Sequence, residues 1–119
     1  MDERDHYGYT PLMIASKYGK GDVVHLLLNR KADVNAEAVI ERMARSPLKF
    51  AIGNFYPSVI KQLVEGGAYV NRKVGGGGTA LHQAALVGGV EATTFLLEAG
   101  ADKGLRNSDG RTAAFLAEM

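Results

Sequence analysis

The stretch Thr10-Pro11-Leu12-Met13-Ile14-Ala15 decides the fold, because its pattern returns three times further along the chain. Its opening three residues recur as Ser46-Pro47-Leu48, as Thr79-Ala80-Leu81 and, in weaker form, as Thr112-Ala113-Ala114. These copies are 36, 33 and 33 residues apart, and leucines keep the same phase at Leu27, Leu63 and Leu96. A fixed period of this length indicates stacked supersecondary units rather than one closed globule.

Each copy predicts two helices joined by a tight turn. A Thr or Ser side chain can cap the first helix, and Pro11 and Pro47 suit its first position. Gly19 and Gly88 stand where that helix must end in a left-handed conformation. The second helix carries apolar residues three and four apart, namely Val23, Val24, Leu27 and Leu28, then Val59, Ile60, Leu63 and Val64, then Ala92, Phe95, Leu96 and Leu97. One unit cannot bury this stripe alone, so neighbouring units must share a continuous apolar seam.

A closing segment completes each unit, as in Ala32-Asp33-Val34-Asn35. Together with T-P-L-x-x-A and a helix-ending glycine, it resembles the ankyrin repeat across essentially the whole chain. The resemblance implies an all-α solenoid of helix–turn–helix pairs joined by β-turn or hairpin loops. It divides one domain of 119 residues into three full repeats and a partial fourth, with boundaries at 1–36, 37–71, 72–105 and 106–119.

The second unit departs from the pattern in its loop, which is three residues longer. The segment Glu37–Arg45 contains helix formers and no Gly, Pro, Asn or Asp. We therefore expect a short helical turn there instead of a hairpin tip, with one side formed by Val39, Ile40 and Met43. These residues either pack on the neighbouring helices or form an exposed ridge beside Arg42 and Arg45.

Phe55 stands where the other units have Gly19 and Gly88. An aromatic residue is costly in the left-handed conformation, so we expect Asn54 to adopt it instead. Phe55 and Tyr56 would then be partly exposed, as partner anchors or against the neighbouring turn. The run Gly75–Gly78 lacks the Lys-Ser/Thr of a phosphate-binding loop, and we interpret it as a turn tip.

The last unit, 106–119, has room for a turn and a first helix only. Without a second helix to cover it, either Phe115 or Leu116 is exposed, or the chain is a fragment of a longer protein. We favour the fragment, and we expect self-association through this end as a liability.

Charge and composition exclude several classes of partner. The chain carries 14 Lys and Arg against 13 Asp and Glu, and no cysteine. Near-neutrality argues against duplex DNA or an anionic membrane, despite a local basic cluster of Arg42, Arg45 and Lys49. No apolar stretch approaches the ~20 residues that cross a bilayer, and no signal peptide is evident. We expect a cytoplasmic protein, with the nucleus as the alternative, that neither binds nucleic acid nor inserts into membranes.

No catalytic or metal-binding pattern is found. The three histidines, His6, His25 and His82, occupy different places in the unit and predict no metal site. His82 matches a histidine that the resemblance assigns a structural hydrogen bond, and His25 should face solvent. No serine lies in a nucleophile elbow. We therefore expect no enzyme, no metal and no cofactor.

The resemblance implies partner contacts at the turn tips and on the exposed side of the first helices. The predicted protein-binding residues are Tyr7, Tyr9, Lys17, Tyr18, Arg42, Met43, Arg45, Asn54, Phe55, Leu86 and Arg111. We favour the row of Tyr7, Tyr9 and Tyr18 beside Lys17 and Arg45. Alternatively, these tyrosines cover the edge of the first unit.

Two other functions stay open. The chain could be a regulatory or scaffolding array within a larger enzyme, channel or effector. It could also be a substrate for modification, because Asn35 and Asn71 match the turn asparagine that is hydroxylated in some ankyrin proteins.

Overall fold

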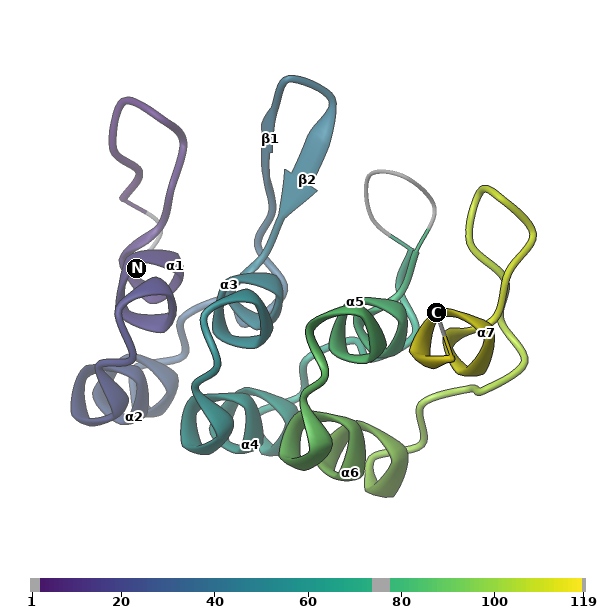
Figure 1. Ribbon diagram of the computed structural model, residues 1–119. Coiled ribbons are helices and arrows are strands. Elements are labelled where there is room, and N and C mark those ends of the chain that lie inside the picture. Colours follow the sequence, from purple (N-terminus) through teal and green to yellow (C-terminus); the bar gives the residue numbers. More distant parts are fainter. Residues whose placement is uncertain (1–2, 74–77, 119) are drawn as a thin grey trace.

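The computed structural model describes residues 3–73 and 78–118 (Figure 1). Gly75, Gly76 and Gly77 of the expected glycine tip lie outside these residues. The described chain contains one hairpin and seven helices: α1 (Pro11–Lys17), α2 (Gly21–Asn29), β1 (Ala38–Ile40), β2 (Met43–Arg45), α3 (Pro47–Gly53), α4 (Pro57–Glu65), α5 (Ala80–Val87), α6 (Val90–Glu98) and α7 (Ala113–Ala117).

The helices form two rows (Figure 1). The inner row is α1, α3, α5 and α7, in which each helix packs on the next, and the outer row is α2, α4 and α6. The loop before α1, the hairpin and the loop before α7 project from the same side, beyond the inner row (Figure 1). This arrangement confirms the predicted solenoid of helix pairs.

The predicted apolar seam is present. Leu27, Leu63 and Leu96 are buried in one core cluster that runs through all the repeats. Val23 and Leu97 are the exceptions, because each faces an open end of the outer row. Val23 is 45% exposed, whereas its equivalent Val59, which has α2 before it, is 1% exposed.

The predicted caps start the inner helices. The hydroxyl oxygens of Thr10 and Ser46 accept the backbone N–H groups of Met13 and Lys49, each at 3.2 Å. Thr112 accepts in the same way from the backbone of Phe115 at 3.3 Å. Three of the four inner helices therefore begin with the same side-chain hydrogen bond, which satisfies a backbone donor that the helix leaves unpaired.

His82 has the structural role that the resemblance implied. The backbone N–H of Thr79 donates to His82 Nδ1 at 3.1 Å, and His82 Nε2 lies 2.8 Å from the carbonyl oxygen of Arg111. Because Nδ1 accepts, the proton is on Nε2 and donates to Arg111. This buried ring therefore caps α5 and ties it to the loop before α7.

The helical turn expected for Glu37–Arg45 is wrong, since the structure has an antiparallel hairpin there. Val39 pairs with Ala44 and Ile40 with Met43, and the two turn residues, Glu41 and Arg42, have φ values of 53° and 67°. Positive φ at both central positions is typical of the two-residue turn that matches the twist of paired strands.

Burial explains this outcome. Alternate residues of β1 pack on a small second core of Tyr9, Met13 and Phe50: Ala38 is buried and Ile40 is partly buried. Val39 faces the opposite way and is exposed, so the expectation that Val39, Ile40 and Met43 share one side is also wrong.

Phe55 itself adopts the left-handed conformation, with φ of 62°, while Asn54 has φ of −107°. The expectation for Asn54 is therefore wrong. The cause is a backbone hydrogen bond that closes this turn in each full repeat, such as Tyr56 N–H to the Ala51 carbonyl at 3.0 Å. This bond fixes which residue must be left-handed, whatever its side chain.

Candidate functional site

The side of the molecule that carries the loops and the inner helices holds most of the predicted contact residues. Tyr7, Arg42, Met43 and Arg111 are exposed there, and Arg45 is half-buried. Lys17 and Tyr18 lie at the end of α1, at the turn into α2, whereas Asn54, Phe55 and Leu86 lie at the equivalent turns of the next two repeats and are exposed. We group Lys17 and Tyr18 with the loop-side residues, because Lys17 reaches the ring of Phe50 that packs on Tyr9, and we call Asn54, Phe55 and Leu86 the turn-side group.

Tyr9 does not belong to the exposed row, because its side chain is only 8% exposed. Its ring meets Phe50 edge-on at 5.2 Å between centroids, and its hydroxyl accepts from Arg45 Nη1 at 3.0 Å. Tyr9 therefore packs between the first and second repeats. Tyr7, whose ring centroid is 5.8 Å from that of Tyr9, stays accessible.

Lys17 connects the first two repeats. Its Nζ lies 5.4 Å from the ring centroid of Tyr18 and 6.0 Å from that of Phe50, which comes from α3. A cation at this distance from aromatic faces is attracted by the ring electrons. Phe50 is not among the residues predicted from the sequence, although its position in the repeat is that of Ile14 and Gln83 on the neighbouring inner helices.

A second cation, Lys49, stands close to this cluster. Its Nζ donates to the carbonyl oxygen of Ala44 at 3.5 Å. Burial lowers the pKa of Lys49, and the nearby positive charge of Arg45 lowers that pKa further. Lys49 was noted in the sequence as basic, but its partial burial depends on the hairpin and was not foreseen.

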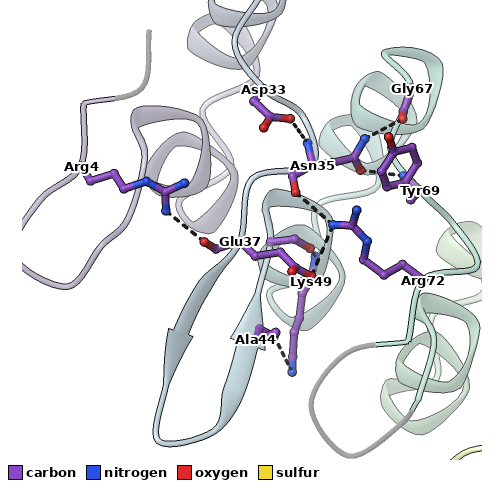
Figure 2. A network of polar contacts seen from close by, with 10 residues as sticks. Arg4, Asp33, Asn35, Glu37, Ala44, Lys49, Gly67, Tyr69 and Arg72 are labelled. Atoms are coloured by element: carbon purple, nitrogen blue, oxygen red, sulfur yellow. Dashed lines mark hydrogen bonds and ion pairs between the residues drawn. The ribbon is translucent and has the colours of Figure 1, made fainter.

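The loop asparagines hold successive repeats together (Figure 2). Asn35 Nδ2 donates to the Gly67 carbonyl at 3.1 Å, and its Oδ1 accepts from the Tyr69 backbone at 2.8 Å. Asn71 makes the equivalent bonds to Gly100 and Asp102 one repeat further on. Both side chains thus have a structural role, and their hydroxylation stays a prediction.

Arg72 reinforces the same junction (Figure 2). It donates to the Asn35 carbonyl at 3.2 Å, forms an ion pair with Glu37 at 3.4 Å, and stacks 4.5 Å from the Tyr69 ring centroid. A small hollow of about 30 Å³ lies beside it, lined in part by Lys49, Thr79 and Gln83. Arg72 is exposed, but its charge is partly neutralised by Glu37 within the chain.

The turn-side group forms a separate apolar surface. Phe55, Val87 and Val90 line an open hollow of about 380 Å³ between the second and third repeats.

At the C-terminal end, Arg111 stacks on Phe115, with its guanidinium 4.6 Å from the ring centroid. Of the two residues in doubt at this end, Leu116 is buried and Phe115 is exposed.

Two absences are reported for the residues that the structure describes. No three His, Cys, Asp or Glu side chains come together in a way that could hold a metal ion. No helix in this part of the chain is long and apolar enough to span a membrane.

Stacked helix pairs with loops on one side define a repeat solenoid, and comparison with known families identifies which one. Residues 7–38 match the family model for the ankyrin repeat, and residues 48–119 match the model for three copies of the ankyrin repeat. The chain therefore belongs to the ankyrin repeat family, whose modules typically mediate protein–protein interactions. The unmatched residues between the two regions include strand β2 of the hairpin.

Several characterised proteins are similar over nearly the whole chain. The mouse B-cell lymphoma 3 protein homolog is 34% identical over 117 residues, which are 98% of this chain and 26% of that protein. The tyrosine-protein kinase HTK16 of Hydra vulgaris is 31% identical, and the match covers 98% of this chain and 15% of the kinase. Neurogenic locus notch homolog protein 1 of Xenopus tropicalis is 28% identical, with coverage of 98% and 6%. The chain thus spans about a quarter or less of these relatives.

Proposed function

We propose that this chain is a protein-interaction module with no catalytic activity of its own. Its partner would contact the loop tips and the exposed side of the inner helices. The observation that supports this most is the row of accessible Tyr7, Tyr18 and Met43 beside Lys17 and Arg45. Tyr and Arg are enriched at binding hot spots, because they combine large contact area with hydrogen bonding.

The favoured row differs from that inferred from the sequence, because Tyr9 is buried and the exposed Met43 is added. Tyr9 supports the surface from beneath, because its ring packs on Phe50 and its hydroxyl accepts the hydrogen bond that orients Arg45. Tyr7 and Tyr18 are the rings that a partner can cover. We place this interaction in the cytoplasm or the nucleus, with a protein and not a nucleic acid as the partner.

A second candidate function is a regulatory or scaffolding array within a larger protein. Its support is the coverage of the relatives, because the matched region is 15% of a tyrosine-protein kinase and 6% of a notch protein. In that case the same loop-side surface would contact another part of the parent chain, or a protein that the parent recruits.

Site-specific photo-crosslinking tests the proposed surface. A benzoylphenylalanine replaces Tyr7, Tyr18 or Met43 on the loop side, or else the exposed His25, Lys61 or Thr94 on the outer helices. We expect crosslinks to a partner, or to another part of a parent chain, from the loop-side positions. Crosslinks of equal yield from the outer helices, or from those helices alone, would contradict the proposal.

A further inference from the structure

The charges of the chain are unevenly distributed between the two rows of helices. The inner helices α1, α3, α5 and α7 contain Lys17 and Lys49 and not one Asp or Glu. The outer helices contain a single Lys or Arg, Lys61, and four acidic residues, namely Asp22, Glu65, Glu91 and Glu98. A nearly neutral protein therefore has a positive inner row and a negative outer row.

Lys17, Arg45 and Lys49 are held by neutral groups. Among the residues that the structure describes, no Asp or Glu oxygen lies within 4.0 Å of the charged nitrogens of Lys17, Arg45 or Lys49. Neutral groups hold them instead: two aromatic rings for Lys17, the Tyr9 hydroxyl for Arg45 and the Ala44 carbonyl for Lys49. These contacts orient the three charges and leave them uncompensated, unlike Arg72, which is paired with Glu37.

We propose that Lys17, Arg45 and Lys49, here called the basic surface, bind an acidic, carboxylate-rich segment of a partner protein. This inference rests on the proposed function and names the chemistry of the partner. Carboxylate oxygens accept hydrogen bonds from Lys and Arg, and a matched charge speeds association and selects the partner. The exposed rings of Tyr18, next to Lys17, and of Tyr7, next to the Tyr9 ring that holds Arg45, add apolar contact.

Charge complementarity favours an acidic peptide over a nucleic acid. A protein that binds duplex DNA through its backbone neutralises several phosphates, often about six to ten. The basic surface offers three cations, and the hairpin tip above it also carries Glu41. A few fixed cations between tyrosine rings suit separated carboxylates better than a continuous line of phosphates.

The spacing of the cations predicts the spacing of the acids. Lys17 is on α1 and Lys49 is on α3, and neighbouring packed helices are about 8–10 Å apart. Lys17 also lies about one helical turn further along its helix than Lys49 does, which adds an offset of about 5.4 Å. The combined separation of roughly 11 Å corresponds to about three residues of a polyproline II chain, which rises ~3.1 Å per residue and presents the same face at every third residue. The segment should therefore carry acidic residues three positions apart.

Fluorescence anisotropy with synthetic peptides tests this inference on the full chain. The probe is a labelled 12-residue peptide with Glu at every third position and Ser or Gln elsewhere. Matched probes replace every Glu with Gln or with Lys, or place all Glu residues consecutively. We expect the spaced Glu peptide to bind best, the Gln and Lys peptides not to bind, and the affinity to fall as salt screens the charges.

The protein variants have a close internal control. Lys61 on outer helix α4 lies 6.0 Å from the Phe95 ring, as Lys17 lies 6.0 Å from Phe50. Lys17→Gln should lower the affinity about three- to fivefold, as expected for one exposed ion pair, and Lys61→Gln should leave it unchanged. Lys17→Arg should keep the binding, and circular dichroism verifies that each variant is folded.

Three results would overturn the inference: no binding of the spaced Glu peptide, equal loss with Lys61→Gln, or tighter binding of a labelled single-stranded oligonucleotide. If photo-crosslinks from Tyr18 persist in any of these cases, only the acidic character of the partner is refuted. If the crosslinks fail as well, the proposed function is refuted with it.

Discussion

The turn glycines of the first and third repeats offer a test of how the repeats contact each other. Gly19 and Gly88 occupy the same place in the repeat and have φ values of 68° and 73°. A Cβ atom at Gly19 would lie 2.5 Å from the ring of Tyr56, which belongs to the second repeat, whereas one at Gly88 would meet no atom within 4 Å. Alanine at these two positions therefore separates backbone strain from a clash between repeats.

The expected magnitudes differ. A non-glycine residue in the left-handed conformation costs about 1–2 kcal/mol, and the lower entropy of the unfolded alanine chain returns about 0.4–1 kcal/mol. Gly88→Ala should thus reduce the free energy of unfolding by about 1 kcal/mol. Gly19→Ala adds an overpacking cost of about 1–3 kcal/mol, because the Tyr56 ring must move, for a total of about 2–4 kcal/mol.

Urea denaturation followed by circular dichroism measures both free energies of unfolding. The double variant Gly19→Ala with Tyr56→Ala removes the obstructing ring, so its cost should be about 1–3 kcal/mol less than the sum of the two single costs. Equal destabilisation by Gly19→Ala and Gly88→Ala, or strictly additive costs in the double variant, would refute the proposed contact between turn and ring.

Four further outcomes are expected. His82→Ala removes the bonds to Thr79 and Arg111, so stability should fall by about 2–3 kcal/mol and the amides of α7 should exchange faster with deuterium; unchanged exchange would show that the ring does not hold α7. Leu63→Ala, at a fully buried position, should cost about 2–5 kcal/mol in urea denaturation, against less than about 1 kcal/mol for Val23→Ala at the open end of the outer row. Arg45→Gln should raise the pKa of Lys49 towards 10.5, because a repelling charge is removed, and a lysine side-chain NMR titration checks this direction. The folded-state pKa of Lys49 is below its unfolded value, so the unfolded chain binds more protons at Lys49 between these two pKa values. Lys49 therefore destabilises the fold at neutral pH, and this cost is relieved as the pH rises towards 10.5. The variant Lys49→Met should remove this pH dependence of the free energy of unfolding.

The features that the sequence predicted correctly depend on local chemistry. Thr10 and Ser46 bond to a backbone group three residues away, so a hydroxyl before Pro-Leu is enough to locate the helix start. The seam of Leu27, Leu63 and Leu96 follows from the repeat period alone. The repeat period and the helix caps are therefore enough to predict each helix pair without knowledge of the contacts between repeats.

The features that it missed depend on contacts between distant residues. Helix propensity favoured a turn in Glu37–Arg45, but burial of alternate residues against Tyr9 and Phe50 stabilises strands instead. The burial of Tyr9 likewise depends on Arg45, 36 residues away. Steric cost argued against a left-handed Phe55, but the hydrogen bond that closes its turn decided the conformation.

Backbone amide NMR shifts, recorded for the full chain with and without its bound partner, test the central claim most directly. We predict that the shifts change for the loop before α1, for the hairpin β1–β2 and for helices α1 and α3, while the amides of α2, α4 and α6 keep their free-state values. Changes confined to the outer helices, with Tyr7, Tyr18 and Met43 unaffected, would contradict the assignment of the loop side as the contact surface.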